Sequence, residues 1–87
     1  MKKTMKNNRP ERIILRIIKQ FKDLRLELDM SHDELAKRSG VTRPAISHIE
    51  GGRRKPSLIM SLRLAQALDK ELSEMLSEAE EKESEKK

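Results

Sequence analysis

Polar side chains with hydrogen-bonding groups gather near the middle of this 87-residue chain. Arg43, Ser47 and His48 are interleaved with two aliphatic residues, Ile46 and Ile49, that stand three positions apart. Residues three apart lie on the same side of a helix, so burial of the isoleucines would leave the polar side chains pointing outward. Such a surface offers donors and acceptors for recognising a partner.

The charge of the chain favours a polyanionic partner. Its formal net charge is +5, and the distribution is uneven: residues 1–10 carry +4, residues 11–70 carry +5 and residues 71–87 carry −4. A basic domain with an acidic tail suits a polyanion, and the tail would either add solubility or engage another partner. Taken alone, the charge fits a solvated, highly charged surface equally well.

No catalytic constellation is evident in the sequence. The serines lack a base with an orienting group, and Gly51-Gly52 lack the spacing of a phosphate-binding loop. His32 and His48 stand 16 positions apart in a chain without cysteine, which makes a poor metal site. Phe21 is the only aromatic residue, which argues against base stacking on single strands and against a flat-cofactor site. We therefore expect no enzyme activity, no cofactor and no metal.

Two short helices joined by a tight turn are expected to position the polar surface. Ser31 and Glu34 form an S-x-x-E capping box, which predicts the start of the first of them. Gly40 can adopt the left-handed conformation that ends this helix. Thr42 is placed to cap the second helix, where Pro44 is tolerated because it falls in the first turn.

The spacing of small, glycine and aliphatic residues is that of a helix-turn-helix. The positions that agree with it are Ala36, Gly40, Val41, Ile46 and Ile49. Together with the run I-E-G-G-R-R-K-P-S-L at residues 49–58, this stretch resembles the helix-turn-helix regulators of the Cro/C1 (XRE) type, which include lambdoid phage repressors. The resemblance covers residues 17–76.

The resemblance implies that the helix over residues 43–50 lies in the major groove of duplex DNA. By position, the implied base readers are Arg43, Pro44, Ser47 and His48. Arg43 would donate two hydrogen bonds to guanine O6 and N7, and Pro44, where the family is often polar, would make van der Waals contact. His48 would donate or accept according to its tautomer.

A second group of residues is expected to contact the DNA backbone. These are His32, Thr42, Arg53, Arg54 and Lys55. The first two lie at or near helix N-termini, where phosphate binds favourably, and the three cations would set affinity rather than sequence preference. The family often has glutamine at the position of His32. Because histidine, unlike glutamine, changes its charge near neutral pH, this phosphate contact is expected to depend on pH.

The expected fold is all-α: a five-helix, lambda-repressor-like domain with an extended first helix from Pro10 to about Asp29. Its inward face is expected to consist of Ile13, Ile14, Ile17, Phe21, Leu24 and Leu28. Leu15 and Leu26 lie on the opposite face and Ile18 on its edge, so the extension is either a dimer seam or a helix with isolated exposed leucines.

An ion pair and two further helices complete the expected domain. The resemblance implies a structural pair between Arg25 and Glu50 that ties the first helix to the third. The fourth helix is expected over residues 58–68, with Leu58, Leu62, Ala65 and Leu68 inward. Asp69 stands where the family usually has glycine. The fifth helix is expected over residues 71–77, packing through Leu72, Met75 and Leu76.

Three segments follow from this interpretation. Residues 1–9 are expected to be a disordered basic arm, residues 10–77 the helix-turn-helix DNA-binding domain, and residues 78–87 a charged tail that is frayed or disordered. No apolar run is long enough to span a membrane. The absence of cysteine fits a reducing cytoplasm, which is the expected location.

We expect a double-stranded DNA-binding transcriptional regulator, in the form of a homodimeric repressor on an inverted repeat. Half-sites one helical turn apart, about 34 Å, would place both reading helices on one face of the DNA. The alternative is a protein-interaction module of the same fold, antitoxin-like or a bridging adaptor, with DNA binding secondary or lost. A toxin or polymerase as protein partner, and the choice between repressor and activator, stay open.

Overall fold

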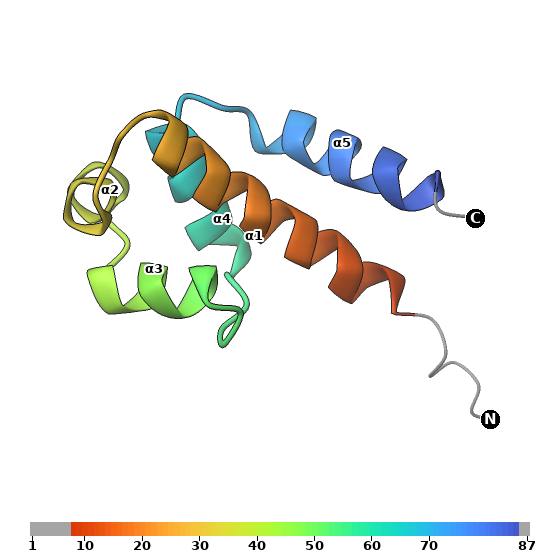
Figure 1. Ribbon diagram of the computed structural model, residues 1–87, viewed down its shortest axis with the longest axis horizontal. Helices are drawn as coiled ribbons and strands as arrows, with labels where there is room; N and C mark the ends of the chain where they lie inside the picture. Colours follow the sequence, from red (N-terminus) through yellow and green to blue (C-terminus); the bar gives the residue numbers. More distant parts are fainter. Residues whose placement is uncertain (1–7, 86–87) are drawn as a thin grey trace.

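The computed structural model describes residues 8–85. Within this range the chain forms five helices and no strand, which confirms the all-α, lambda-repressor-like class. The helices are α1 (Arg9–Glu27), α2 (His32–Ser39), α3 (Arg43–Glu50), α4 (Leu58–Ala67) and α5 (Leu72–Ser84). In Figure 1, α5 runs alongside α1, while α2 and α3 lie together at the other end of the molecule. Most of the arm expected over residues 1–9 lies outside the described residues.

The caps predicted around the helix-turn-helix are present. Ser31 Oγ accepts a hydrogen bond from the Glu34 amide at 3.0 Å, and Thr42 Oγ1 accepts from the Ala45 amide at 3.3 Å. Gly40 ends α2 with φ +76°, the left-handed conformation that its lack of a Cβ permits. These local interactions fix where α2 ends and where α3 begins.

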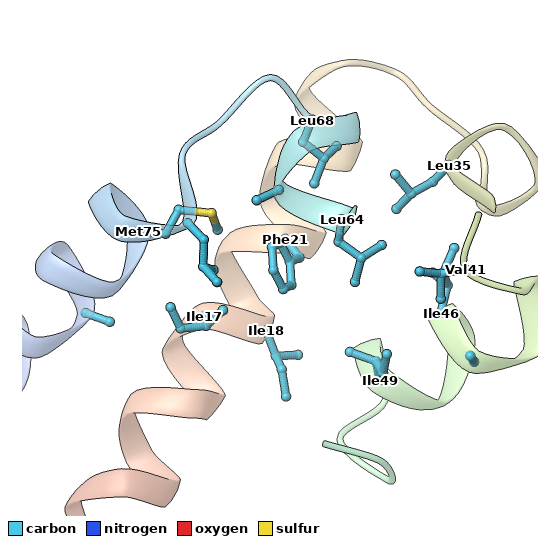
Figure 2. Close-up of a cluster of buried hydrophobic side chains, with 14 of the residues drawn as sticks. Ile17, Ile18, Phe21, Leu35, Val41, Ile46, Ile49, Leu64, Leu68 and Met75 are labelled. Atoms are coloured by element: carbon cyan, nitrogen blue, oxygen red, sulfur yellow. The ribbon is translucent and has the colours of Figure 1, made fainter. Parts of the chain in front are cut away.

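An aliphatic core centred on Phe21 joins the helices (Figure 2). Phe21 of α1 lies next to Leu64 of α4 and Leu68, the C-cap residue of that helix. Leu35 of α2 and Ile46 of α3 close the opposite side. All five side chains are almost completely buried. Because the core includes α2 and α3 as well as α1 and α4, the outer surface of α3 is held by packing beneath it.

The buried face of α1 differs from the expected one. Ile18, expected on the edge, is buried, whereas Leu28, expected inward, is 49% exposed. The helix contacts both α5 and α3, so a wider arc of its surface is covered than one amphipathic stripe predicts. Leu28 lies beyond the last helical residue, Glu27, where the chain has left the helical period.

The inward face of α4 was predicted wrongly at two positions. Leu58 is 70% and Leu62 46% exposed, while Ser61 and Leu64 are buried with the expected Ala65 and Leu68. The helix is apolar on most of its sides, so its periodicity could not identify the buried face. Packing against α2 and α5 selected it. The buried Ser61 hydroxyl is satisfied by donating to the Ser57 carbonyl at 2.9 Å.

Helix α5 continues to Ser84, so the expected end at Ser77 is wrong and the charged tail expected from residue 78 begins inside a packed helix. Ala79 is buried against α1, and Glu83 accepts hydrogen bonds from Arg12 Nε at 2.8 Å and Arg16 Nε at 2.6 Å. These two hydrogen bonds lower the pKa of Glu83. The early start of α1 therefore provides the surface on which the acidic end of the chain folds.

Aspartates follow both α1 and α4 in the left-handed conformation. Asp29 has φ +58° and Asp69 φ +59°. After Asp29, the Met30 amide donates to the Arg25 carbonyl at 3.0 Å, and after Asp69 the Lys70 amide donates to the Ala65 carbonyl at 2.9 Å. Both helices thus end in the six-to-one hydrogen bond of a Schellman motif, with aspartate in the place that glycine usually occupies.

Candidate nucleic-acid interface

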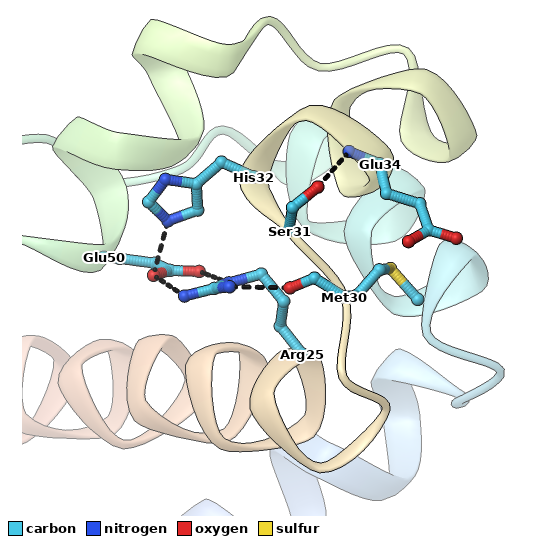
Figure 3. Close-up of polar contacts among 6 residues, drawn as sticks. All are labelled: Arg25, Met30, Ser31, His32, Glu34 and Glu50. Atoms are coloured by element: carbon cyan, nitrogen blue, oxygen red, sulfur yellow. Dashed lines mark hydrogen bonds and ion pairs between the residues drawn. The ribbon is translucent and has the colours of Figure 1, made fainter.

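Four residues from three segments meet beneath one end of α3 (Figure 3). Arg25 of α1 donates to Glu50 of α3 through Nε at 2.7 Å and Nη2 at 3.0 Å. Its Nη1 donates to the Met30 carbonyl at 2.7 Å. His32, the first residue of α2, places Nε2 3.0 Å from Glu50 Oε1. The expected partners Arg25 and Glu50 are therefore in direct contact, and His32 extends the pair into a three-residue network.

The Glu50 carboxylate stays charged in this network. Its side chain is only 7% exposed, and burial raises the pKa of a carboxyl group. Hydrogen bonds from Arg25 and His32, together with their positive charge, outweigh burial and leave the pKa of Glu50 below its ordinary 4.5. The network joins the ends of α1, α2 and α3 and so fixes the orientation of α3.

The outer surface of α3 is open to solvent. Arg43, Pro44 and His48 are exposed and Ser47 is half-buried. Ala45, Ile46 and Ile49 hold the opposite face against the core. The four residues expected to read bases thus lie on one exposed side of a helix whose other side is anchored.

Arg43 has a neighbour that the sequence did not indicate. Its Nε lies 3.5 Å from Oδ1 of Asp33, in the first turn of α2, and the two side chains are 63% and 71% exposed. The residues are ten positions apart, and only the crossing of α2 and α3 brings them together. No local motif could have identified Asp33 as part of this surface.

The two residues expected to bind phosphate at helix starts have different surroundings. Thr42 is exposed at the start of α3, and its hydroxyl oxygen caps that helix. His32 turns Nε2 toward Glu50 while its side chain stays 28% exposed. Nδ1 is therefore the nitrogen of His32 left for a DNA phosphate. Phosphate binding at His32 stays a prediction.

The cationic loop lies directly after α3. Arg53, Arg54 and Lys55 are all exposed, and the Arg53 amide donates to the His48 carbonyl at 2.9 Å, which holds the start of the loop against the end of α3. The loop is thus positioned by the helix whose outer face carries the expected base readers.

Arg63 of α4 is a further cation beside this surface that sequence reasoning missed. Its Nη1 lies 2.9 Å from the position that a Cβ would take at Gly40, so the guanidinium covers the turn between α2 and α3. Arg63, Arg54, Thr42 and Ile59 line a shallow hollow there. No sequence motif identifies Arg63, because its place depends on how α4 packs against α2.

Residues 8–85 show neither a metal-binding cluster nor a membrane-spanning helix. No group of three or more histidine, cysteine, aspartate or glutamate side chains in this range could hold a metal ion. In the same part of the chain, no helix is both long and apolar enough to span a bilayer. The candidate recognition site among the described residues is the exposed α3 surface with its neighbouring cations.

Comparisons with known proteins show the family to which this fold belongs. The helix-turn-helix family model matches residues 21–75. A protein of Methanothermobacter thermautotrophicus, described as an uncharacterized HTH-type transcriptional regulator, is 48% identical over 51 residues, which cover 59% of this chain and 74% of the relative. A protein of Archaeoglobus fulgidus with the same description is 32% identical over 56 residues, which cover 64% and 79%. No solved structure gives a significant match. The chain therefore belongs to the Cro/C1-type (XRE) family of helix-turn-helix transcriptional regulators.

Proposed function

We propose that this protein is a sequence-specific repressor that binds an inverted repeat in duplex DNA as a homodimer, with α3 in the major groove. The observation that supports the proposal best is the exposed side of α3. Arg43, Pro44, Ser47 and His48 point away from a face that is buried in the core. The major groove admits a helix, and base edges there present patterns that such side chains can distinguish.

The cations around α3 supply the affinity in this proposal. Arg53, Arg54 and Lys55 follow α3 directly, and Arg63 and Thr42 flank its beginning. We assign these residues to phosphates, where they position the protein without reading sequence. With roughly 6–10 phosphates neutralised per complex, affinity should fall by about three orders of magnitude or more between about 50 and 200 mM salt.

The homodimer is assigned to the exposed apolar side of α4. Leu58 and Leu62 are four residues apart on the same side of the helix and are both exposed. They come directly after the cationic loop, so a two-fold contact there would place two copies of that loop close together. The alternative seam on α1 would use Leu15 and Leu26, whose side chains are exposed as well.

Selection of bound sequences from random duplex DNA tests the proposal. The expected result is an enriched inverted repeat with guanine in each half-site and half-site centres about 34 Å apart, or a multiple of one helical turn. An enriched site without two-fold symmetry would contradict the proposed homodimer but not the proposed DNA binding. If the protein binds no duplex even at low ionic strength, the proposal fails and the fold serves as a protein-interaction module.

A further inference from the structure

We propose that Asp33 is a positioning residue that holds the Arg43 guanidinium for guanine and thereby narrows the sequence preference of this protein. The inference rests on the proposed DNA binding. It assigns a role to a residue of α2 that lies outside the reading helix. Its basis is the ion pair between Asp33 Oδ1 and Arg43 Nε, 3.5 Å apart across the turn.

The ion pair between Asp33 and Arg43 contributes little to the stability of the fold. Its two side chains are 63% and 71% exposed, and ion pairs so open to solvent contribute little to folding. The crossing of α2 and α3 is already held by the Thr42 cap, by the Gly40 turn and by core residues. The pair lies on the same outer side of the molecule as the expected base readers, where its effect would be on recognition.

The geometry decides which edge of the guanidinium is free for DNA. Asp33 lies against Nε, so Nη1 and Nη2 form the edge directed away from the carboxylate. Two parallel N–H donors match the adjacent acceptors O6 and N7 of guanine. Arginine side chains are otherwise flexible, and phosphate oxygens, which every sequence presents, compete for the same donors.

The charge of Asp33 penalises the competing arrangement. If Arg43 swings to a phosphate, an unpaired carboxylate is left close to the DNA backbone, where like charges repel. If Arg43 stays beside Asp33 and meets guanine, the carboxylate remains neutralised. Asp33 thus disfavours the non-specific contact of Arg43 more than the specific one.

Glu34 provides a matched control for Asp33. It carries the same charge in the same first turn of α2, but its carboxylate accepts a hydrogen bond from Arg38 Nη2 at 3.2 Å. Asp33→Asn and Glu34→Gln therefore remove the same charge from the same end of the same helix. Only the first removes the partner of Arg43.

The test measures binding of both variants to the selected duplex and to duplexes in which each guanine of the half-site is replaced. The guanine read by Arg43 is the one whose preference disappears in Arg43→Ala. We expect Asp33→Asn to reduce that preference by about two- to fivefold, while Glu34→Gln leaves it unchanged. In an Arg43→Ala background, Asp33→Asn should have no further effect on base preference.

Three results would overturn the inference. Asp33→Asn could keep the full guanine preference, Glu34→Gln could lower it equally, or the effect of Asp33→Asn could persist without Arg43. In each case the wild-type protein still selects its site, so the proposed function stands. If the wild-type protein shows no sequence preference at all, the proposed function itself fails.

Discussion

Glu50 accepts hydrogen bonds from two side chains that belong to two different helices, with Arg25 on one side and His32 on the other. Arg25 and Glu50 are 11% and 7% exposed, so neither charge is fully solvated by water. The single residue thereby links the helix that reads DNA in the proposed function to the scaffold beneath it. Replacement of Glu50 should therefore lower both the stability of the fold and the affinity for DNA.

Glu50→Gln should lower the free energy of unfolding by about 2–3 kcal/mol at neutral pH, because Arg25 keeps its charge without a matching carboxylate. The pKa of Glu50 is lowered in the folded protein, so the ion pair contributes fully above pH 4.5 and loses its contribution as the pH falls through the lowered value. The difference between wild type and variant should therefore shrink on acidification. Urea denaturation over a pH series measures it.

The control for this prediction is Glu27→Gln, at an exposed carboxylate of α1. It should change the free energy of unfolding by less than about 0.5 kcal/mol at any pH. A difference between wild type and Glu50→Gln that grows as the pH falls would contradict the assigned direction of the Glu50 pKa.

Arg43 and Lys55 are expected to affect DNA binding in different ways. Arg43→Ala should cost about 1–3 kcal/mol at a site with guanine and relax the preference at that base pair. Lys55→Ala should weaken binding to all duplexes similarly and reduce the salt slope by about one. Titrations of specific and unrelated duplexes at several salt concentrations distinguish the two. A uniform loss in Arg43→Ala would assign that residue to phosphate.

At the scale of the element, the helix ends show where local conformation costs stability. Asp69 adopts φ +59° at the end of α4, a region in which residues with a Cβ are strained. Asp69→Gly should therefore raise the free energy of unfolding by about 0.5–1 kcal/mol, and Asp69→Ala should lower it. Thermal unfolding of both variants gives the sign. If Asp69→Gly destabilises the protein, the interactions of the aspartate side chain contribute more to stability than the strain of its left-handed backbone costs.

At the scale of the whole molecule, the packing of α5 against α1 joins the first and the last helix. A protein that ends at Ser77 loses the buried Ala79 and the carboxylate of Glu83 between Arg12 and Arg16. Its melting temperature should fall by roughly 4–8 °C or more, as expected for a loss of about 1 kcal/mol or greater in a domain of this size. A chain that ends at Glu85 keeps α5 and should melt like the full protein. Equal melting of both truncated chains would mean that α5 adds nothing after Ser77.

The dimer proposed through α4 is also a property of the whole molecule. Leu58→Glu should convert the dimer to a monomer, because a two-fold contact through α4 would bring two like charges, one from each copy, close together. Leu58 is 70% exposed at the first position of α4, where an acidic residue is tolerated, so folding should be unaffected. Sedimentation measures the mass of each variant in solution, and Leu15→Glu on α1 is the matched variant that tests the alternative interface. Dissociation by Leu15→Glu instead would assign the seam to α1.

Much of this protein could be predicted from sequence because its decisive signals are local. Ser31, Gly40 and Thr42 act on amides and backbone angles within a few residues, so the limits of α2 and α3 were predictable. The buried isoleucines of α3 follow from helical spacing, and with them the outward direction of Arg43 and His48. Membership of the helix-turn-helix family rests on these same residues.

Tertiary structure decided the contacts between helices. The buried arcs of α1 and α4, the length of α5, and the pairing of His32 with Glu50 and of Asp33 with Arg43 all depend on how separate helices pack. A side chain's partner on another helix is set by the crossing of the two helices, which periodicity along one of them does not contain. Helical spacing thus predicts which surface of α3 faces outward, whereas the packing of the helices sets the neighbours of its charged groups.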